Sequence, residues 1–310
     1  MRVLLALAGP TAVGKTEVSL KLAPLINAEV VCSDSRQIYK YLDIGTAKVP
    51  ESRRAGIPHH LLDIALPDEK ITLSDYQQKA YAAINEIFDK GRIALMVGGT
   101  GLYIKAVTEG YELPFAPPQK DFREKCSEEV KKQGTLHLHQ RLAEVDAESA
   151  GKIHPNDARR IIRALEVYQF TGKPLSSYTF KEVNPLNARI LKICLSMDRK
   201  RLYQKINDRV LKMVEKGLVE EVKKVLDMGY ENSLMEMKVM GYHEFIPYFQ
   251  GKISLDEAIA RFQKDTRNYA KRQITWFRAD KEIIWVDLDK FSGIEEAVKR
   301  IKEIVDENIK

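Results

Sequence analysis

A glycine-rich segment close to the N-terminus restricts the fold of this chain more than any other feature. Residues Gly9–Thr16 read GPTAVGKT and match the phosphate-binding pattern G-x-x-x-x-G-K-[ST]. The segment follows the short apolar run Val3–Ala8 and precedes a predicted helix that begins near Lys15. A strand, a glycine-rich loop and a helix in this order are the context that a phosphate-binding loop requires. The pattern therefore predicts a site for a di- or triphosphate.

Each residue type in this loop has a physical task at a phosphate group. The glycines let the backbone bend so that its N–H groups converge on phosphate oxygens. The lysine supplies a positive charge, the threonine hydroxyl can hold Mg²⁺, and the helix directs its positive dipole end at the same anion. Thr16 is the expected Mg²⁺ ligand. The residues expected to bind the phosphates are Gly9, Thr11, Ala12, Gly14, Lys15 and Thr16.

Strand and helix patterns alternate through the first hundred residues. Ala28–Cys32 and Ile93–Val97 are short apolar runs that end at polar or glycine residues. Between them, residues 74–90 have apolar side chains at helical spacing. This alternation predicts a parallel sheet that is covered by helices on both faces.

The pattern changes after the first hundred residues. Only helical spacing occurs from Gln119 to Thr171, whereas Ile190–Leu195 and Ile283–Val286 predict later strands. We therefore expect an α/β fold, with a P-loop NTPase-like parallel sheet flanked by helices and an all-helical insertion domain. The expected parts are residues 1–115 for the first part of the core, 116–180 for the insertion, and 181–310 for the mostly helical continuation of the core.

Composition and cysteine content bear on the compartment. The chain has 310 residues, of which 44% are hydrophobic and 30% are charged, as is usual for globular proteins. It contains no apolar run of about 18 residues, the length a membrane helix needs. Its three cysteines are far apart and odd in number, which argues against a disulfide framework. We expect a cytoplasmic monomer that makes no contact with a membrane.

Positive charge is concentrated near the C-terminal end. Seven Lys or Arg residues stand against two acidic residues within Arg261–Lys281. This excess favours a polyanionic partner, although an ordinary solvated helix face explains the charge alone equally well. Helical spacing gathers Phe262, Tyr269 and Trp276 on one face, where we interpret them as core residues and not as a platform for stacked bases. A different face carries Lys264, Arg267, Lys271 and Arg278.

Two polar residues directly follow predicted strands. Asp34 comes after the second strand and Thr100 after the third. In open parallel sheets, chemistry gathers at the carboxyl ends of the strands, so both residues can face the phosphate loop. Asp34 can act as a general base or touch the metal ion, or it can cap a following helix. Its position alone leaves these alternatives open.

Three segments together resemble the tRNA dimethylallyltransferases, also called tRNA isopentenyltransferases. They are Gly9–Thr16, Asp34–Tyr39 (DSRQIY) and Gly98–Tyr103 (GGTGLY). Seven separated motifs in matching order, up to about residue 280, are far more specific than a phosphate loop alone. The other four are Gly56–Leu61 (GIPHHL), Asn156–Ile161 (NDARRI), Gly241–Glu244 (GYHE) and Lys271–Arg278 (KRQITWFR).

The resemblance implies a reaction and a role for particular residues. A dimethylallyl group would pass from dimethylallyl diphosphate to N6 of the adenine just 3′ of the anticodon, position 37 in tRNAs that read codons beginning with U. It implies that Asp34 is the base, that Thr100 positions or activates the reacting groups, and that Arg209 contacts the diphosphate. The residues implied to face the anticodon stem-loop of tRNA are Asp34, Ser35, Arg36, Gln37, Thr100, Arg123, Arg159, Arg160, Arg163, Lys271 and Arg278.

Two other functions remain compatible with the phosphate loop. The first is a P-loop kinase that uses ATP and a small acceptor, with the helical insertion as a lid. The second is a non-catalytic RNA-binding protein with a nucleotide switch, which leaves Asp34 and Thr100 without a task. The motifs that begin at Asp34 and Gly98 favour the transferase, with Mg²⁺ as the cofactor.

Overall fold

The computed structural model of the chain describes residues 1–114, 116–117, 119–178 and 185–309. The chain divides into two compact units, each with a hydrophobic core of its own. Unit 1 consists of Met1–Ile71, Asp75–Thr108 and Leu186–Lys310, and unit 2 consists of Thr72–Ser74 and Glu109–Pro185.

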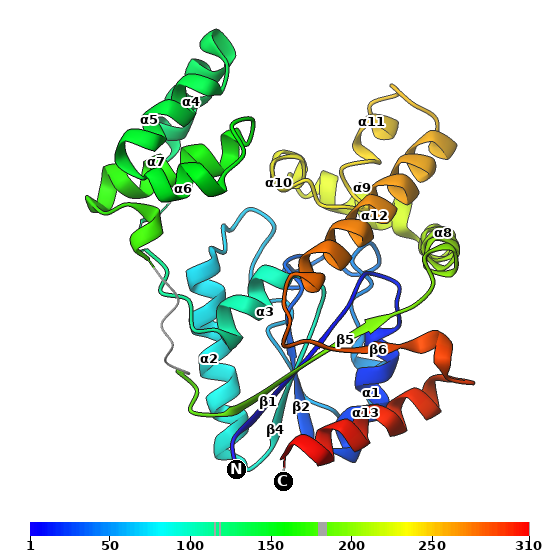
Figure 1. Cartoon of the computed structure of the whole chain (residues 1–310). Helices are drawn as coiled ribbons and strands as arrows, with labels where there is room; N and C mark the ends of the chain where they lie inside the picture. The colour runs from blue at the N-terminus through cyan, green and yellow to red at the C-terminus, as the bar shows by residue number, and fades with distance from the viewer. Residues whose placement is uncertain (115, 118, 179–184, 310) are drawn as a thin grey trace. The chain divides into compact units, whose positions relative to one another are not determined.

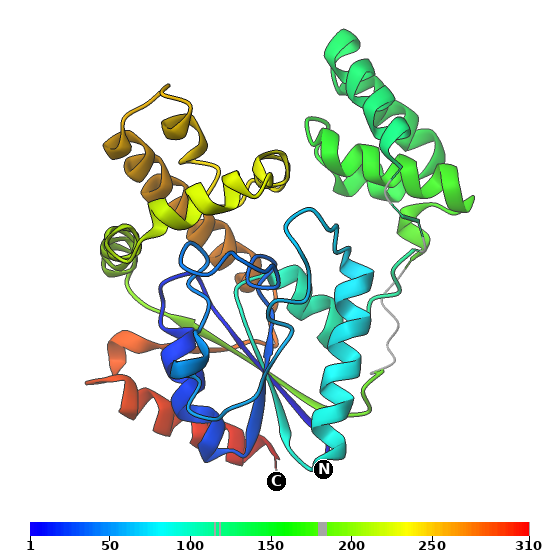
Figure 2. The same ribbon diagram turned by 180° about the vertical axis from the view of Figure 1, so that it is seen from behind.

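One parallel sheet of six strands forms the centre of unit 1 (Figure 1). Its strands are β1 (Val3–Ala8), β2 (Ala28–Cys32), β3 (His59–His60), β4 (Ile93–Val97), β5 (Arg189–Ser196) and β6 (Ile284–Asp287). Their order across the sheet is β3-β2-β4-β1-β5-β6. β1 lies between β4 and β5, with Leu5 opposite both Leu95 and Leu191. All of its residues are buried, because helices cover both faces of the sheet (Figures 1 and 2).

The predicted α/β class and its parallel sheet are confirmed. The strands predicted at Val3–Ala8, Ala28–Cys32 and Ile93–Val97 coincide with β1, β2 and β4. The strands predicted at Ile190–Leu195 and Ile283–Val286 differ from β5 and β6 by one residue at each end. The sequence did not predict β3, because a strand of two residues is too short to show alternation.

Helices cover both faces of the sheet (Figures 1 and 2). They are α1 (Lys15–Leu25), α2 (Leu73–Asp89), α3 (Gly101–Thr108) and α13 (Ile294–Ile309). On one face, Leu5 and Leu7 of β1 pack in a core with Val18 and Leu22 of α1 and Ile301 of α13. The other face is covered by α2 and α3. This arrangement leaves the carboxyl ends of the strands free to carry the loops of a site.

A second helical core in unit 1 lies beyond the carboxyl ends of the strands. Its helices are α8 (Arg199–Glu215), α9 (Leu218–Asp227), α10 (Glu231–Met237), α11 (Ile246–Phe249) and α12 (Leu255–Arg278). Tyr242, Phe245 and Phe262 are buried in this core. The Ser254 side chain accepts a hydrogen bond from the Glu257 N–H and so defines the start of α12. Short 3₁₀ turns occur at Glu51–Arg53, Leu175–Ser177 and Leu288–Lys290.

The aromatic residues of α12 differ in burial. Phe262 is buried in the helical core, as predicted, and Tyr269 is half-buried. Trp276 is 41% exposed, so the interpretation of the whole stripe as core is wrong for this residue. The reason is that α12 extends past the helical core toward the strand ends, where Trp276 lies against Gly101 at the start of α3 and not in a hydrophobic interior. Among the described residues, no helix combines the length and the apolar content that crossing a membrane requires.

The described residues of unit 2 form a bundle of four α-helices. They are α4 (Lys120–Gln133), α5 (Leu136–Val145), α6 (Ala147–Lys152) and α7 (Ala158–Thr171). Leu138, Leu142, Ile161 and Leu165 pack together in its core. Ile161 and Leu165 therefore point inward, as the helical spacing of the sequence predicts.

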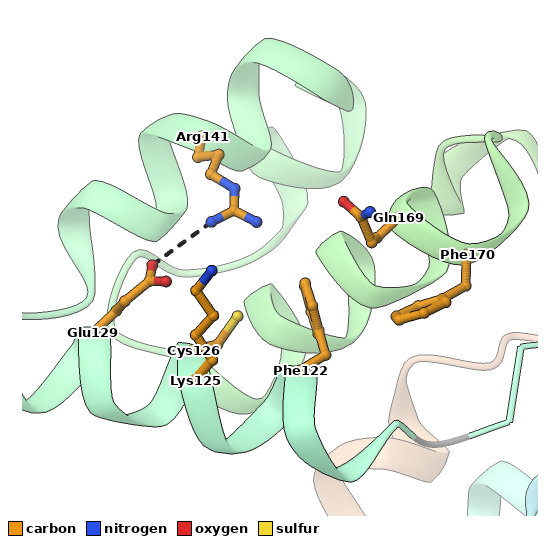
Figure 3. Close-up of a pocket in the computed structure, with 7 residues that line it drawn as sticks. All are labelled: Phe122, Lys125, Cys126, Glu129, Arg141, Gln169 and Phe170. Carbon is orange, nitrogen blue, oxygen red and sulfur yellow. Dashed lines mark ion pairs between the residues drawn. The ribbon is translucent and has the colours of Figure 1, made fainter.

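Unit 2 also contains a cavity of about 220 Å³ (Figure 3). An ion pair between Arg141 and Glu129, 3.6 Å apart, lies at its rim. No residue that the sequence singled out for the site lines this cavity. The lining residues are Phe122, Lys125, Cys126, Glu129, Arg141, Gln169 and Phe170.

Candidate active site

The three segments singled out in the sequence meet at the carboxyl edge of the sheet. β2, β4 and β1 are neighbours, and each of them ends in one of these segments. The Ser33 N–H donates to the Val97 carbonyl oxygen at 2.8 Å, and the Gly98 N–H donates to the Leu7 carbonyl oxygen at 3.3 Å. The structure thus brings the phosphate loop, Asp34 and Thr100 together, as predicted from their positions directly after strands of a parallel sheet.

The phosphate loop leads directly into α1. Gly14 precedes the helix with a φ of 117°, in a region that glycine adopts far more readily than other residues. It has no side chain that could cap α1, so the first N–H groups of the helix face the loop. The backbone of Gly9–Thr16 therefore has the form of an anion-binding loop.

Lys15 folds back onto this loop. Its Nζ donates to the carbonyl oxygens of Gly9 and Pro10 at 2.9 and 2.8 Å. Burial lowers the pKa of Lys15 to about 8, the positive charge of Arg209 acts in the same direction, and the negative charge of Asp34 opposes both. The ammonium group is thus a partly desolvated charge, which interacts strongly with an anion.

Arg209 brings a second cation to the loop from α8. It is half-buried, and burial lowers its pKa while the charge of Asp34 acts in the opposite direction. Lys15, Arg209 and Asp34 therefore form one group of interacting charges. Two cations and one carboxylate leave this group with a positive charge, which suits a diphosphate.

Asp34 caps a turn. Its Oδ1 accepts hydrogen bonds from the backbone N–H groups of Arg36 at 2.9 Å and Gln37 at 3.4 Å. The residues that follow form a turn and no helix, so the helix-capping alternative does not apply. In the described part of the chain, no hydrogen bond is made by Oδ2. One oxygen therefore orients the carboxylate, and the other is available for proton transfer.

Thr100 is held against the Asp34 turn. Its N–H donates to the Ser33 carbonyl oxygen at 3.2 Å, and its Oγ1 accepts from the Ser35 N–H at 3.0 Å. The approach of the two segments requires glycine, because a Cβ on Gly98 would lie 2.0 Å from the Ser33 carbonyl oxygen. Thr100 also hydrogen-bonds the Tyr269 side chain, whose pKa is raised to about 12 by burial and by the charge of Asp34.

Gln273 joins the phosphate loop and the loop that carries Thr100 to α12. It was not predicted as a site residue. Its Oε1 accepts from the Thr11 N–H at 2.8 Å, and its Nε2 donates to the Gly99 carbonyl oxygen at 2.8 Å. A signal was present, since Gln273 lies four residues after Tyr269 and three before Trp276, on the same helical face. The Thr11 N–H, expected at the phosphates, is engaged by this glutamine.

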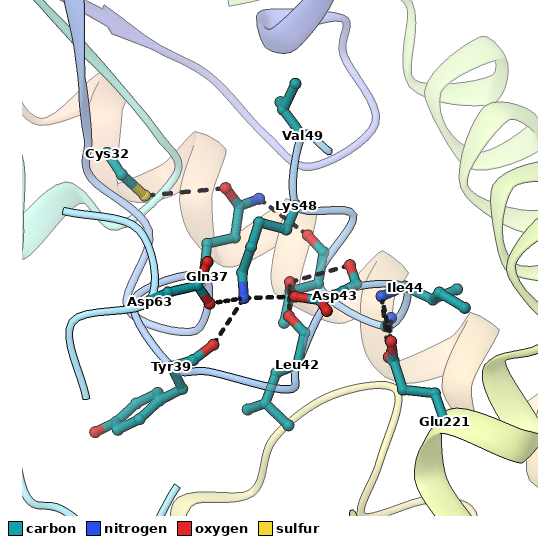
Figure 4. Close-up of polar contacts among 12 residues, drawn as sticks. Cys32, Gln37, Tyr39, Leu42, Asp43, Ile44, Lys48, Val49, Asp63 and Glu221 are labelled. Carbon is teal, nitrogen blue, oxygen red and sulfur yellow. Dashed lines mark hydrogen bonds and ion pairs between the residues drawn. The ribbon is translucent and has the colours of Figure 1, made fainter. Parts of the chain in front are cut away.

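The segment after Asp34 is fixed by buried polar contacts (Figure 4). Lys48 is buried, and its Nζ lies 2.8 Å from the Tyr39 carbonyl oxygen, 2.7 Å from Asp43 Oδ1 and 2.6 Å from Asp63 Oδ1. Nearby, Gln37 Nε2 donates to the Thr46 carbonyl oxygen at 3.0 Å. These contacts hold Gln37, one of the predicted tRNA-facing residues, in a defined place.

Arg36 is also engaged within the chain. Its Nη2 donates to the Met237 carbonyl oxygen at 2.7 Å, at the end of α10. Ser35 contributes its N–H to Thr100. The predicted tRNA-facing residues 35–37 are therefore held by hydrogen bonds to three other segments of the chain.

The four predicted arginines of unit 2 fall into two pairs. Arg123 and Arg163 donate to the buried carboxylate of Glu166, at 2.7 and 2.6 Å. The Arg123 bond joins α4 to α7, whereas Arg163 and Glu166 both lie on α7. Arg159 and Arg160 are exposed on the first turn of α7, where Arg160 also lies 3.4 Å from Asp157. The second pair is exposed at the surface, and Arg159 has no acidic partner among the described residues.

The basic face of α12 is exposed. Lys264, Lys271 and Arg278 lie at the surface and have no acidic partner among the residues that the structure describes. Arg267 donates to Asn207 Oδ1 at 2.6 Å, and the Arg272 guanidinium lies 5.8 Å from the centre of the Tyr269 ring. This face is available to a polyanion.

Comparison with known proteins agrees with this geometry. The sequence pattern of a family described as IPP transferase matches residues 37–280, more than half of the chain. The chain is 48% identical over 306 residues to the tRNA dimethylallyltransferase of Carboxydothermus hydrogenoformans, covering 98% of this chain and 96% of that protein. It is 42% identical over 299 residues to the protein of the same name from Acetivibrio thermocellus, covering 96% of each.

Solved structures give the same result. A tRNA isopentenylpyrophosphate transferase from Bacillus halodurans matches with a TM-score of 0.71 and 39% identity, covering 99% of this chain and 98% of that chain. A eukaryotic dimethylallyltransferase described as acting on tRNA matches with a TM-score of 0.83 and 29% identity, covering 99% of this chain and 80% of that chain.

Proposed function

The chain belongs to the IPP transferase family, that of the tRNA dimethylallyltransferases, and we propose that it transfers a dimethylallyl group to tRNA. The donor is dimethylallyl diphosphate. The acceptor is N6 of the adenine at position 37, next to the anticodon, in tRNAs that read codons beginning with U. The observation that carries this proposal is the meeting of the phosphate loop with Asp34 and Thr100 at one edge of the sheet.

The phosphate loop holds the leaving group. When the allylic C–O bond breaks, negative charge grows on the diphosphate. Lys15, Arg209 and the N–H groups at the start of α1 stabilise this charge, because they are preorganised and partly removed from water. The dimethylallyl group is transferred through its carbon atom, and the diphosphate leaves intact.

A divalent cation, which we take to be Mg²⁺, fits this loop. Thr16 offers a hydroxyl oxygen in the first turn of α1, and the diphosphate supplies further oxygens, which together are the hard ligands that Mg²⁺ prefers. When bound, Mg²⁺ neutralises part of the charge on the departing diphosphate.

Asp34 accepts the proton of the reaction. The N6 amine attacks the allylic carbon, a C–N bond forms as the C–O bond breaks, and the amine becomes acidic. Asp34 Oδ2 takes the proton while Oδ1 stays bound to the N–H groups of Arg36 and Gln37. Thr100 positions the reacting groups, and its hydroxyl is itself oriented by Ser35 and Tyr269.

The adenine must leave its stack to reach the carbon, so it is flipped into the site. Ser35, Arg36 and Gln37 line the path of the base beside Asp34. Lys271 and Arg278 on α12 bind RNA phosphates, which supply much of the affinity. We also assign unit 2 as the insertion domain that contacts the anticodon stem-loop, with Arg159 and Arg160 as its exposed cations. Arg123 acts there mainly by holding α4 against α7, and Arg163 by orienting the carboxylate of Glu166.

A P-loop kinase is not favoured. The relatives and the matching solved structures carry names of transferases that act on tRNA. The site also has a carboxylate with a free oxygen beside the phosphate loop, which deprotonation of an amine requires.

The assay that tests the proposal follows the mass of the RNA. The protein and Mg²⁺ are incubated with unmodified tRNA and dimethylallyl diphosphate, and in parallel with tRNA and ATP. We expect the tRNA to gain one dimethylallyl group in the first mixture and no mass in the second. A tRNA with guanine in place of the target adenine is the control and should gain nothing. ATP hydrolysis without a change in RNA mass would point to a kinase or a switch.

A further inference from the structure

A separate cluster of metal-ligating side chains lies in the helical core of unit 1. His243 and Glu244 lie in the turn before α11, and Asp265 lies on α12. Figure 1 shows these two helices. One ring nitrogen of His243 and one carboxylate oxygen from each of Glu244 and Asp265 lie within 4.8 Å of one another. This spacing brings three possible ligands within reach of a single ion.

Glu244 has an oxygen that the protein leaves unpaired. Its side chain is almost completely buried, and Oε2 accepts from the Gly241 N–H at 2.8 Å. Oε1 is buried and has no hydrogen-bond partner among the described residues. A buried carboxylate oxygen without a partner is costly, so an ion or proton is expected beside it.

Burial raises the pKa of Glu244 to about 8, and the negative charge of Asp265 acts in the same direction. The hydrogen bond from the Gly241 N–H opposes this change. The carboxylate oxygens of Glu244 and Asp265 lie within 4.8 Å of each other, so their negative charges repel, and a bound cation offsets this repulsion.

His243 makes one contact that histidine ligands of metal ions commonly make. Its Nδ1 lies 2.9 Å from the Val239 carbonyl oxygen and 3.2 Å from Glu244 Oε2. Histidine ligands commonly donate one ring N–H to a backbone carbonyl, which fixes the ring and leaves the other nitrogen for the ion. The alternative is an ion pair between a protonated His243 and Glu244, which leaves Oε1 of Glu244 unsatisfied.

We propose that His243, Glu244 and Asp265 bind a Zn²⁺-type divalent cation. One imidazole and two carboxylates are ligands that Zn²⁺ accepts, whereas Mg²⁺ and Ca²⁺ favour oxygen alone. The ion joins the turn at 241–244 to α12. Because α12 carries Gln273 and the basic face, the ion stabilises the helix that closes the active site. It takes no part in the transfer step.

Metal titration of the full chain tests this proposal. The protein is freed of metal with a chelator and titrated calorimetrically with ZnCl₂, and separately with MgCl₂, in the absence of diphosphate. The titration is made at about pH 8, since metal binding displaces protons from its ligands. We expect a saturable Zn²⁺ site of one equivalent, much weaker binding of Mg²⁺, and a higher Tm with Zn²⁺.

Matched variants identify the ligands. Mutation of a residue that only hydrogen-bonds to a metal ligand lowers metal affinity by about 10–100-fold. Glu244→Gln replaces a ligand itself, so it should weaken Zn²⁺ binding by at least that much. Glu215→Gln makes the same chemical change at an exposed end of α8 and should bind as the original chain does. If Glu244→Gln does not fold by circular dichroism, His243→Asn is measured in its place. Absence of saturable binding in the original chain, or equal affinity in all variants, would overturn the proposal.

Discussion

The Oε1 atom of Gln273 accepts a 2.8 Å hydrogen bond from the N–H of Thr11, 262 residues earlier in the chain. Its Nε2 donates at the same distance to the Gly99 carbonyl oxygen. A single buried amide therefore joins α12 to the phosphate loop and to the loop that carries Thr100. The helix with the exposed basic face and the phosphate loop are parts of one hydrogen-bonded unit.

Replacement of Gln273 by leucine should weaken both the fold and the site. Leucine has a similar size but leaves the buried Thr11 N–H and Gly99 carbonyl unpaired, at a cost of about 1–3 kcal/mol each. We expect a lower free energy of unfolding in urea and a higher KM for dimethylallyl diphosphate. Gln273→Glu keeps the acceptor for Thr11, so a similar KM for the two variants would contradict a role of this bond in shaping the loop.

The sequence predicted the centre of the fold better than its edges. Strands β1, β2 and β4 are buried on both faces, so the sequence shows them as short apolar runs. The ends of these runs identify the loops that follow, which contain Asp34 and Thr100. Gln273 was not predicted as a site residue. Helical spacing places it on the face of Tyr269 and Trp276, but its two partners are backbone groups, which a side-chain pattern does not identify.

The exposure of Trp276 and the ion pairs of Arg123 also escaped prediction. Periodicity gives the face of a helix but not what covers that face, so the aromatic stripe of α12 was interpreted as core along its whole length. Charge in the sequence likewise does not reveal the buried Glu166 that engages Arg123. The assignment of individual residues to tRNA or diphosphate stays a prediction.

Asp34→Asn should slow the transfer step without weakening the binding of tRNA. Asparagine keeps an oxygen for the Arg36 and Gln37 N–H groups but cannot act as a base at Oδ2. We expect kcat to fall by about 10²–10⁴-fold in single-turnover measurements. Asp34→Ala, which also loses the turn cap, should bind tRNA less well than Asp34→Asn. Unchanged chemistry in Asp34→Asn would rule out the base assignment.

The charge of Lys15 should impose an upper pH limit on substrate capture. Its pKa is lowered from 10.5 to about 8 by burial, so the free enzyme loses this cation as pH rises through about 8. We expect kcat/KM for dimethylallyl diphosphate to fall above that pH, and kcat to fall only at higher pH, because bound diphosphate favours the charged lysine.

The desolvation of Lys15 should make the stability of the fold rise with pH over the range in which kcat/KM falls. Between about pH 8 and 10.5 the unfolded chain binds the Lys15 proton more tightly than the folded chain does. The free energy of unfolding should therefore gain a contribution that rises with pH across this window. Lys15→Met lacks that contribution. Parallel stability curves for the two proteins from pH 8 to 10.5 would show that the lysine is not desolvated.

Glu166 should make unit 2 sensitive to acid. Burial acts to raise its pKa, but hydrogen bonds from Arg123, Gln119 and Arg163 outweigh burial, and the net pKa lies below 4.5. Its contribution to stability is thus complete above about pH 4.5 and is lost as pH falls through the lowered value. In chemical unfolding, Glu166→Gln should be less stable at neutral pH and should lose less stability on acidification than the original chain. Glu128→Gln, an exposed change on α4, is the control.

The basic face of α12 should appear in the salt dependence of tRNA binding. Lys271 and Arg278 are exposed and lack acidic partners among the described residues, so each can release one counterion when it meets a phosphate. Lys271→Ala and Arg278→Ala should each reduce the slope of log K against log salt by about 1. Lys299→Ala removes an equally exposed charge from α13, and its slope should match that of the original chain. Equal slopes for all four proteins would remove this face of α12 from the RNA interface, whatever the effect on activity.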